Sequence, residues 1–140
     1  MDSFRLLVVD DEKDFLETLV KRLNKRNIDA TGVPSGEKAL EVINEKPFDV
    51  VVMDVKMPGL DGIETLRELK KVNPGIEVII LSGHASVDAA MDGMKLGAYE
   101  YLLKPCEIEE LIEKIDRAYE LKADRDKRVR KAEIRKMIEK

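Results

Sequence analysis

The chain contains 140 residues, of which 44% are hydrophobic and 39% are charged, and its formal net charge is −4. That length suits one globular domain, and the share of hydrophobic residues argues against a disordered chain. A single cysteine excludes an internal disulfide, and one cysteine with one histidine cannot form a His/Cys zinc cluster. Any metal ion would therefore have to be held by oxygen ligands.

Five segments of the chain have the character of β-strands. Three are continuously apolar and rich in β-branched residues, which is typical of parallel strands covered on both faces: Leu6 to Val9, Val50 to Met53 and Val78 to Leu81. Two others mix polar and apolar residues, as strands at the edges of a sheet do: Ile28 to Val33 and Tyr99 to Leu103. The sequence thus predicts three central strands and two edge strands.

A segment with helical spacing of apolar residues follows each strand. These segments are Phe15 to Leu23, Ala39 to Ile43, Ile63 to Leu69, Val87 to Met94, and Ile108 to Tyr119. Ser35 and Ser86 are suitable N-caps for the second and fourth helices. The alternation predicts an α/β fold, a flavodoxin-like (βα)5 doubly wound parallel sheet with strand order 2-1-3-4-5.

The end of the chain differs in charge from the rest. Residues 122–140 contain nine Lys or Arg and four Asp or Glu, which leaves 16 basic and 25 acidic residues for 1–121. We expect a globular domain over 1–121 and a charged basic helical extension or linker over 122–140, supported by pairs such as Asp124 with Arg128. No helix-turn-helix or similar module is visible, so nucleic-acid binding by this chain alone is not expected.

Nothing in the sequence indicates a membrane protein. The longest apolar runs are four residues, whereas a membrane span needs about 18. The first residues, Met1 to Ser3, begin no signal peptide. We therefore expect a soluble cytoplasmic protein.

Polar residues follow the apolar runs where a doubly wound sheet binds its ligands, outside the carboxyl ends of the strands. Asp10 and Asp11 follow the first run, and Asp54 follows the third predicted strand. These two strands would be neighbours, so three carboxylates would crowd together and repel one another unless a cation neutralised them. Because Mg²⁺ prefers hard oxygen ligands, the pattern predicts a site for Mg²⁺, or for the similar Mn²⁺.

Two further polar residues suggest what the metal would help to bind. Ser82 follows the fourth apolar run and Lys104 follows the fifth strand. A hydroxyl donor, an ammonium group and a metal ion could together neutralise the three oxygens of a phosphoryl group. Asp54 would then be free to act as a nucleophile.

These residues and their spacing resemble the receiver domain of two-component response regulators, over about Arg5 to Tyr119. The resemblance is carried by four motifs: Val8 to Glu12, Val52 to Gly62, Leu81 to His84, and Gly97 to Pro105. Each motif alone is weak, but their joint occurrence at these spacings is highly specific.

The resemblance implies a role for each site residue. Asp54 would accept a phosphoryl group from the phosphohistidine of a sensor histidine kinase or a phosphotransfer protein. Asp10, Asp11, Asp54 and the backbone carbonyl of Lys56 would bind Mg²⁺, and Lys104 would pair with a phosphoryl oxygen. Such a domain catalyses its own phosphorylation and dephosphorylation but is a signalling module rather than an enzyme.

The resemblance also implies a conformational switch. Ser82 would move toward the phosphoryl group and Tyr101 would swing inward, which would change the surface formed by the fourth helix, the fifth strand and the fifth helix. That surface would bind a partner or a second copy of the chain. The bond between Lys104 and Pro105 resembles the cis peptide of the family.

Other interpretations remain open for some of these features. Tyr101 could be an ordinary edge-strand aromatic residue. A pseudo-receiver that binds partners without phosphorylation is the alternative function. An aspartyl-nucleophile phosphatase is a weaker one, because Lys56 stands where that class has its general acid. A flavin or nucleotide binder is disfavoured, because Asp10 to Glu12 would repel a phosphate.

Overall fold

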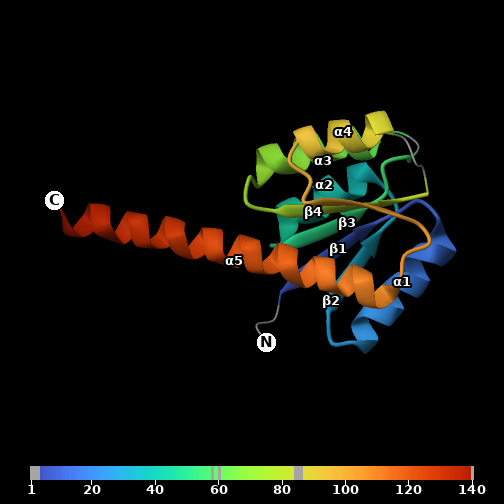
Figure 1. Ribbon diagram of the computed structural model, residues 1–140, viewed down its shortest axis with the longest axis horizontal. Helices are drawn as coiled ribbons and strands as arrows, with labels where there is room; N and C mark the ends of the chain where they lie inside the picture. The colour runs from blue at the N-terminus through green and yellow to red at the C-terminus, as the bar shows by residue number, and fades with distance from the viewer. Residues whose placement is uncertain (1–3, 58, 60, 84–86, 140) are drawn as a thin grey trace.

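The structure is a computed structural model that describes residues 4–57, 59, 61–83 and 87–139. Within these residues, five strands alternate with five helices (Figure 1). In chain order they are β1 (Arg5–Val9), α1 (Lys13–Lys25), β2 (Asp29–Val33), α2 (Gly36–Glu45), β3 (Val50–Met53), α3 (Gly62–Val72), β4 (Glu77–Ser82), α4 (Val87–Lys95), β5 (Glu100–Leu103) and α5 (Ile108–Ile138).

All neighbouring strands are parallel, and their order is β2-β1-β3-β4-β5. This confirms the flavodoxin-like fold and places the two strands of mixed polarity at the edges. Strands β3 and β4 are buried along their whole length, and β1 is buried from Leu6 onward, because helices cover both faces of the sheet (Figure 1). The continuous apolar runs in the sequence therefore have a direct structural cause.

Alternate residues of the central strands point into two separate cores. On β1, Leu6 and Val8 join the core with α1 and α5, whereas Leu7 and Val9 join the core with α2 and α3. These four side chains are at most 1% exposed. The two cores fix the sheet between two layers of helices, and so fix the positions of the loops at the carboxyl ends of the strands.

The predicted N-cap of α2 is confirmed: the Oγ of Ser35 accepts a hydrogen bond of 3.1 Å from the backbone N–H of Lys38. Ser86, the N-cap predicted for α4, lies outside the described residues. Within the part of the chain that is described, no helix is both long and apolar enough to span a bilayer.

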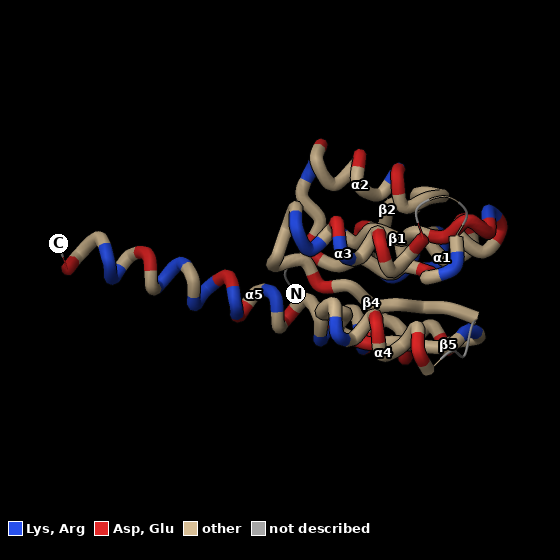
Figure 2. The backbone as a smooth tube through the Cα atoms, turned by 90° about the horizontal axis from the view of Figure 1, so that it is seen from above, with Lys and Arg blue, Asp and Glu red and all other residues tan. Residues whose placement is uncertain are grey.

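Helix α5 runs without a break past residue 121 and projects from the body of the protein (Figures 1 and 2). Its first projecting turn is held by ion pairs at the amino-terminal ends of two strands. The Nζ of Lys122 lies 3.2 Å from Asp49 Oδ1, and a guanidinium nitrogen of Arg125 lies 2.7 Å from Glu77 Oε1. Lys122 also pairs with Asp126 at 2.8 Å. The extension is thus anchored through these residues rather than through the predicted pairs.

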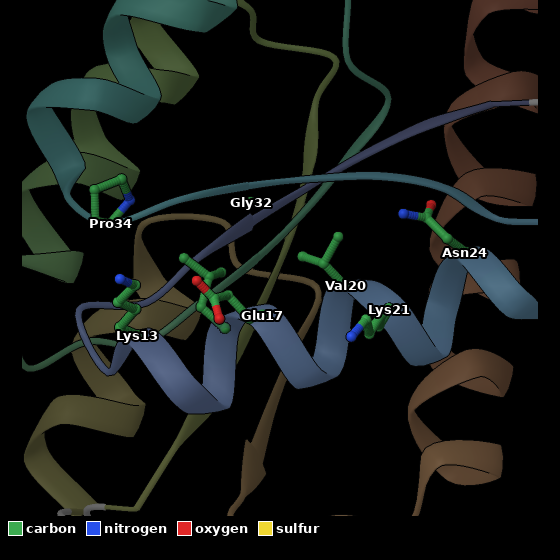
Figure 3. A pocket seen from close by; sticks show the side chains of 8 residues that line it. Lys13, Glu17, Val20, Lys21, Asn24, Gly32 and Pro34 are labelled. Atoms are coloured by element: carbon green, nitrogen blue, oxygen red, sulfur yellow. The ribbon is translucent and has the colours of Figure 1, made fainter.

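A groove of about 630 Å³ is lined by residues of α1, by Gly32 of the edge strand β2 and by Pro34 (Figure 3). Gly32 lies at its floor, where an added Cβ would be 2.9 Å from side-chain atoms of both Leu16 and Val20. The absence of a side chain at Gly32 therefore lets α1 pack closely on β2. The groove has no lining residue in common with the cluster of polar side chains described next.

Candidate functional site

The predicted site residues meet at the carboxyl edge of the sheet. Asp10 and Asp54 directly follow β1 and β3, which are neighbours, and the backbone N–H of Asp54 donates to the carbonyl of Val9. Ser82 is the last residue of β4, and Lys104 directly follows β5. Because all of these strands are parallel, their ends bring the four side chains together.

Asp54 is the centre of this arrangement and is only 5% exposed. Its Oδ1 accepts hydrogen bonds from the Oγ of Ser82 at 2.9 Å and from the backbone N–H of Lys56 at 3.1 Å. Its Oδ2 accepts one from the Nζ of Lys104 at 3.1 Å. Donors from three separate segments of the chain therefore fix the orientation of the carboxylate.

Asp10 is the second buried acid, with 2% exposure. Its Oδ2 accepts a hydrogen bond of 2.7 Å from Lys104, and its Oδ1 accepts one from the backbone N–H of Glu12. Burial raises the pKa of Asp10 above its ordinary value, although both hydrogen bonds oppose the rise. The two hydrogen bonds thus offset only part of the cost of burying the Asp10 carboxylate.

Lys104 links the two acids, since its Nζ contacts both carboxylates. Burial alone would lower the pKa of Lys104, but Asp10 and Asp54 outweigh that effect and raise the pKa above its ordinary value. The ammonium group therefore stays charged at neutral pH. The Lys104 side chain is 15% exposed. Its Nζ also lies 3.5 Å from Oε1 of Glu12, whose side chain is 65% exposed.

The acidic residues form a set of ligand atoms suited to a divalent cation. Carboxylate oxygens of Asp10, Glu12 and Asp54 lie within 4.8 Å of one another. Hard oxygen atoms at this spacing fit Mg²⁺. Asp11, which the sequence suggested as a ligand, lies exposed on the same loop and is not among these three. Glu12 is not among the ligands predicted from the sequence. The only feature of the sequence that could have indicated it is its position directly after Asp10 and Asp11.

A glycine at the start of α3 shapes the loop that follows Asp54. A Cβ on Gly62 would lie 2.3 Å from the carbonyl oxygen of Asp54, so any other residue would displace the backbone. The N–H of Gly62 donates to the carbonyl of Val55 at 2.8 Å, and Asp61 caps the helix by accepting from the N–H of Glu64. This close packing holds the end of β3 and the start of α3 together.

The structure describes some of the remaining residues of the four motifs and leaves out others. The cis peptide between Lys104 and Pro105 is confirmed. Tyr101 is half-buried in β5 and packs against the core formed with α2 and α3. Three other motif residues, Pro58, Leu60 and His84, lie outside the described residues.

A doubly wound sheet with a hydrogen-bonded aspartate at the end of its middle strand, beside a second acid, a lysine and a hydroxyl, defines a receiver-type domain. A sequence model described as the response regulator receiver domain matches residues 6–116. The chain therefore belongs to the response regulator receiver domain family, and it is a signalling domain of a two-component response regulator.

Individual relatives agree with this assignment. The transcriptional regulatory protein ZraR of Escherichia coli strain K12 is 38% identical over 117 residues, which are 84% of this chain and 26% of that protein. The DNA-binding transcriptional regulator NtrC of Klebsiella pneumoniae is 35% identical over 111 residues, or 79% of this chain and 24% of that protein. The chain thus spans about a quarter of the length of these curated relatives.

Solved structures show the same fold. A response regulator receiver domain protein from Clostridium thermocellum superimposes with a TM-score of 0.80 at 37% identity, covering 90% of this chain and 98% of that one. The structure titled FixJ-N also gives a TM-score of 0.80, at 32% identity, covering 86% of this chain and 96% of that one. Both structures therefore match the fold of this chain over most of its length.

Proposed function

We propose that this chain is a phosphoacceptor that receives a phosphoryl group on Asp54 from the phosphohistidine of a histidine kinase or a phosphotransfer protein. The observation that carries the proposal is the convergence of Ser82, the Lys56 N–H and Lys104 on the buried Asp54 carboxylate. A carboxylate held in one orientation is prepared for in-line attack, and the same donors lie where charge would gather on the transferred group.

In the proposed step, a carboxylate oxygen of Asp54 attacks the phosphorus atom. The P–O bond forms as the P–N bond to the imidazole breaks, and the imidazole leaves with the bonding electron pair as a neutral ring, its other nitrogen protonated. Lys104 neutralises charge on the phosphoryl oxygens, and the Ser82 hydroxyl donates a hydrogen bond to them. Later attack by water would release inorganic phosphate and restore Asp54.

We propose that Asp10, Asp11, Asp54 and the carbonyl of Lys56 hold Mg²⁺. When bound, the metal would supply Lewis-acid stabilisation of the transferred group. The proposal is supported by the carboxylate oxygens of Asp10, Glu12 and Asp54, which lie within 4.8 Å of one another. Asp11 directly follows Asp10 and is exposed on the same loop.

We also propose that phosphorylation acts on the surface formed by α4, β5 and α5, through Ser82 and Tyr101. Apolar side chains are unusually exposed there: Met91 is 50% exposed, Met94 47% and Leu103 50%. Exposed apolar side chains of this kind favour a partner or a second copy of the chain. Sedimentation with and without acetyl phosphate and Mg²⁺ tests dimerisation, and an unchanged sedimentation coefficient would contradict it.

The phosphoacceptor role is tested by intact-mass measurement after incubation with acetyl phosphate, with and without Mg²⁺. We expect one added phosphoryl group that requires Mg²⁺ and is lost in Asp54→Asn. Asp14→Asn, which changes an exposed acid in the first turn of α1, is the matched control and should be labelled normally. Absence of labelling on the unaltered chain would favour a phosphorylation-independent pseudo-receiver.

The names of ZraR and NtrC describe transcriptional regulators, but those proteins are about four times as long as the matched region. A cytoplasmic location is proposed on the basis of the family. The division between a domain over 1–121 and an extension over 122–140 also remains a proposal.

A further inference from the structure

The ammonium group of Lys104 contacts an aromatic ring as well as the two carboxylates. The Nζ of Lys104 lies 4.0 Å from the centroid of the Phe15 ring. The same nitrogen lies 2.7 Å from Asp10 and 3.1 Å from Asp54. The ammonium group therefore has an aromatic face and two anions within cation–π or hydrogen-bonding distance.

Phe15 belongs to α1, is partly buried and packs against the core between α1, α5 and the sheet. A cavity of about 160 Å³ lies next to the ring, and Phe15, Leu19, Leu81, Lys104 and Leu111 are among the residues lining it. A smaller side chain at position 15 would enlarge this cavity and admit water beside Lys104. The ring thus limits both the movement and the hydration of the ammonium group.

Such a restraint matters because lysine is a flexible point charge on a four-carbon chain. Glu12 offers Lys104 a competing partner at 3.5 Å, and its side chain is 65% exposed. Attraction to the ring quadrupole opposes a swing toward Glu12 and solvent. An aliphatic residue of similar volume would fill the space but would provide no such attraction.

We propose that Phe15 is a positioning residue of the phosphoryl-transfer reaction, which keeps Lys104 Nζ directed at the Asp54 carboxylate. This inference rests on the proposed function of Asp54. It adds a residue of α1 to the site, and this residue acts through its contact with Lys104. Positional errors in a charged group weaken the electrostatic stabilisation that the transition state receives.

The first test is the rate constant of Mg²⁺-dependent labelling by acetyl phosphate, followed by intact mass. This small donor needs no protein docking surface, so only the site itself is probed. We expect Phe15→Leu to slow labelling by about three- to tenfold, the range that corresponds to a cation–π contact of a partly exposed cation. Phe15→Tyr keeps the ring and should recover most of the rate.

Phe4→Leu is the matched control. It removes a ring that stacks on Tyr119 at 4.5 Å within the same core, at the opposite end of the sheet from the site. We expect Phe4→Leu to lower stability without slowing labelling. Equal slowing by Phe4→Leu, or a failure of Phe15→Tyr to recover the rate, would overturn the inference, because packing alone would then explain the effect.

A second test needs no reaction. In the NMR spectrum of the unphosphorylated protein, the ring current of Phe15 should shift the Hε resonances of Lys104 upfield. The shift should persist in Phe15→Tyr and vanish in Phe15→Leu. Unchanged Lys104 resonances and an unchanged labelling rate in Phe15→Leu would overturn the inference. If the unaltered chain is not labelled, the proposed function fails, and the role of Phe15 in it fails too, even where the ring-current shift is present.

Discussion

The ion pair between Arg125 and Glu77 should make a measurable contribution to the stability of the fold. Glu77 is the first residue of β4, and its side chain is only 3% exposed. Arg125 comes from the projecting part of α5 and lies 2.7 Å away. Arg125→Met keeps a long side chain with good helix propensity but removes the charge. The Glu77 carboxylate would then be buried without this partner.

The expected loss follows from the burial of the two groups. Removing one partner of a fully buried pair costs about 3–5 kcal/mol. Here Arg125 is 43% exposed, so water can approach Glu77 after the substitution. Lys70 also lies close enough to interact with Glu77 electrostatically. We therefore expect a loss of about 1–3 kcal/mol, the range for a buried polar group that loses its partner.

Urea unfolding at pH 7, followed by circular dichroism, measures this loss. Arg117→Met is the control in the same helix, because Arg117 pairs with Glu113 at 2.8 Å but both side chains are more than half exposed. That variant should lose at most about 0.5 kcal/mol. In the double variant with Glu77→Gln, Arg125→Met should cost much less than it does alone. A loss in Arg125→Met no larger than in Arg117→Met would refute the reasoning.

Three further predictions concern the site. Gly62→Ala places a Cβ against the Asp54 carbonyl, so we expect the free energy of unfolding in urea to fall by about 1–3 kcal/mol and labelling to become slower. An unchanged free energy of unfolding together with an unchanged labelling rate would contradict this packing. The pKa of Asp10 is raised in the folded state, so ionisation of Asp10 opposes folding. The stability that protonated Asp10 contributes is present below the ordinary pKa of the carboxyl and is lost as the pH rises through the folded-state pKa. Asp10→Asn should therefore raise the urea midpoint at pH 7 in metal-free buffer, and a lower midpoint would refute it. Mg²⁺ at 100 times its dissociation constant should stabilise the chain by about 2.7 kcal/mol, reversibly with EDTA, and an equal gain in Asp54→Asn would exclude a metal site at Asp54.

Much of the fold could be predicted because its causes are local in the sequence. The run from Val50 to Met53 is apolar at every position because both faces of β3 are covered, and the polar residue that ends it, Asp54, lies at the edge of the sheet. Parallel strands bring all such ends to one edge, so Asp10, Ser82 and Lys104 could be placed together without coordinates. The chemistry of the site follows from this periodicity.

The sequence was less informative where contacts join distant segments. The extension was expected to be stabilised by pairs within the helix, such as Asp124 with Arg128, yet Arg125 reaches back to Glu77. A glutamate beside an apolar run gives no sign that it will be buried. Its burial depends on a partner that the sheet and α5 bring together only after folding.

By itself, the sequence determined the alternation of strands and helices, the strand order and the four side chains at the carboxyl edge of the sheet. The tertiary structure alone decided that Glu12 rather than Asp11 lies in the acidic cluster, and that Phe15 covers Lys104. The physical reason is that a periodic pattern encodes which face of an element is buried. Side-chain contacts within a site depend instead on rotamers and on the packing angles of α1 against the sheet, which no local pattern specifies.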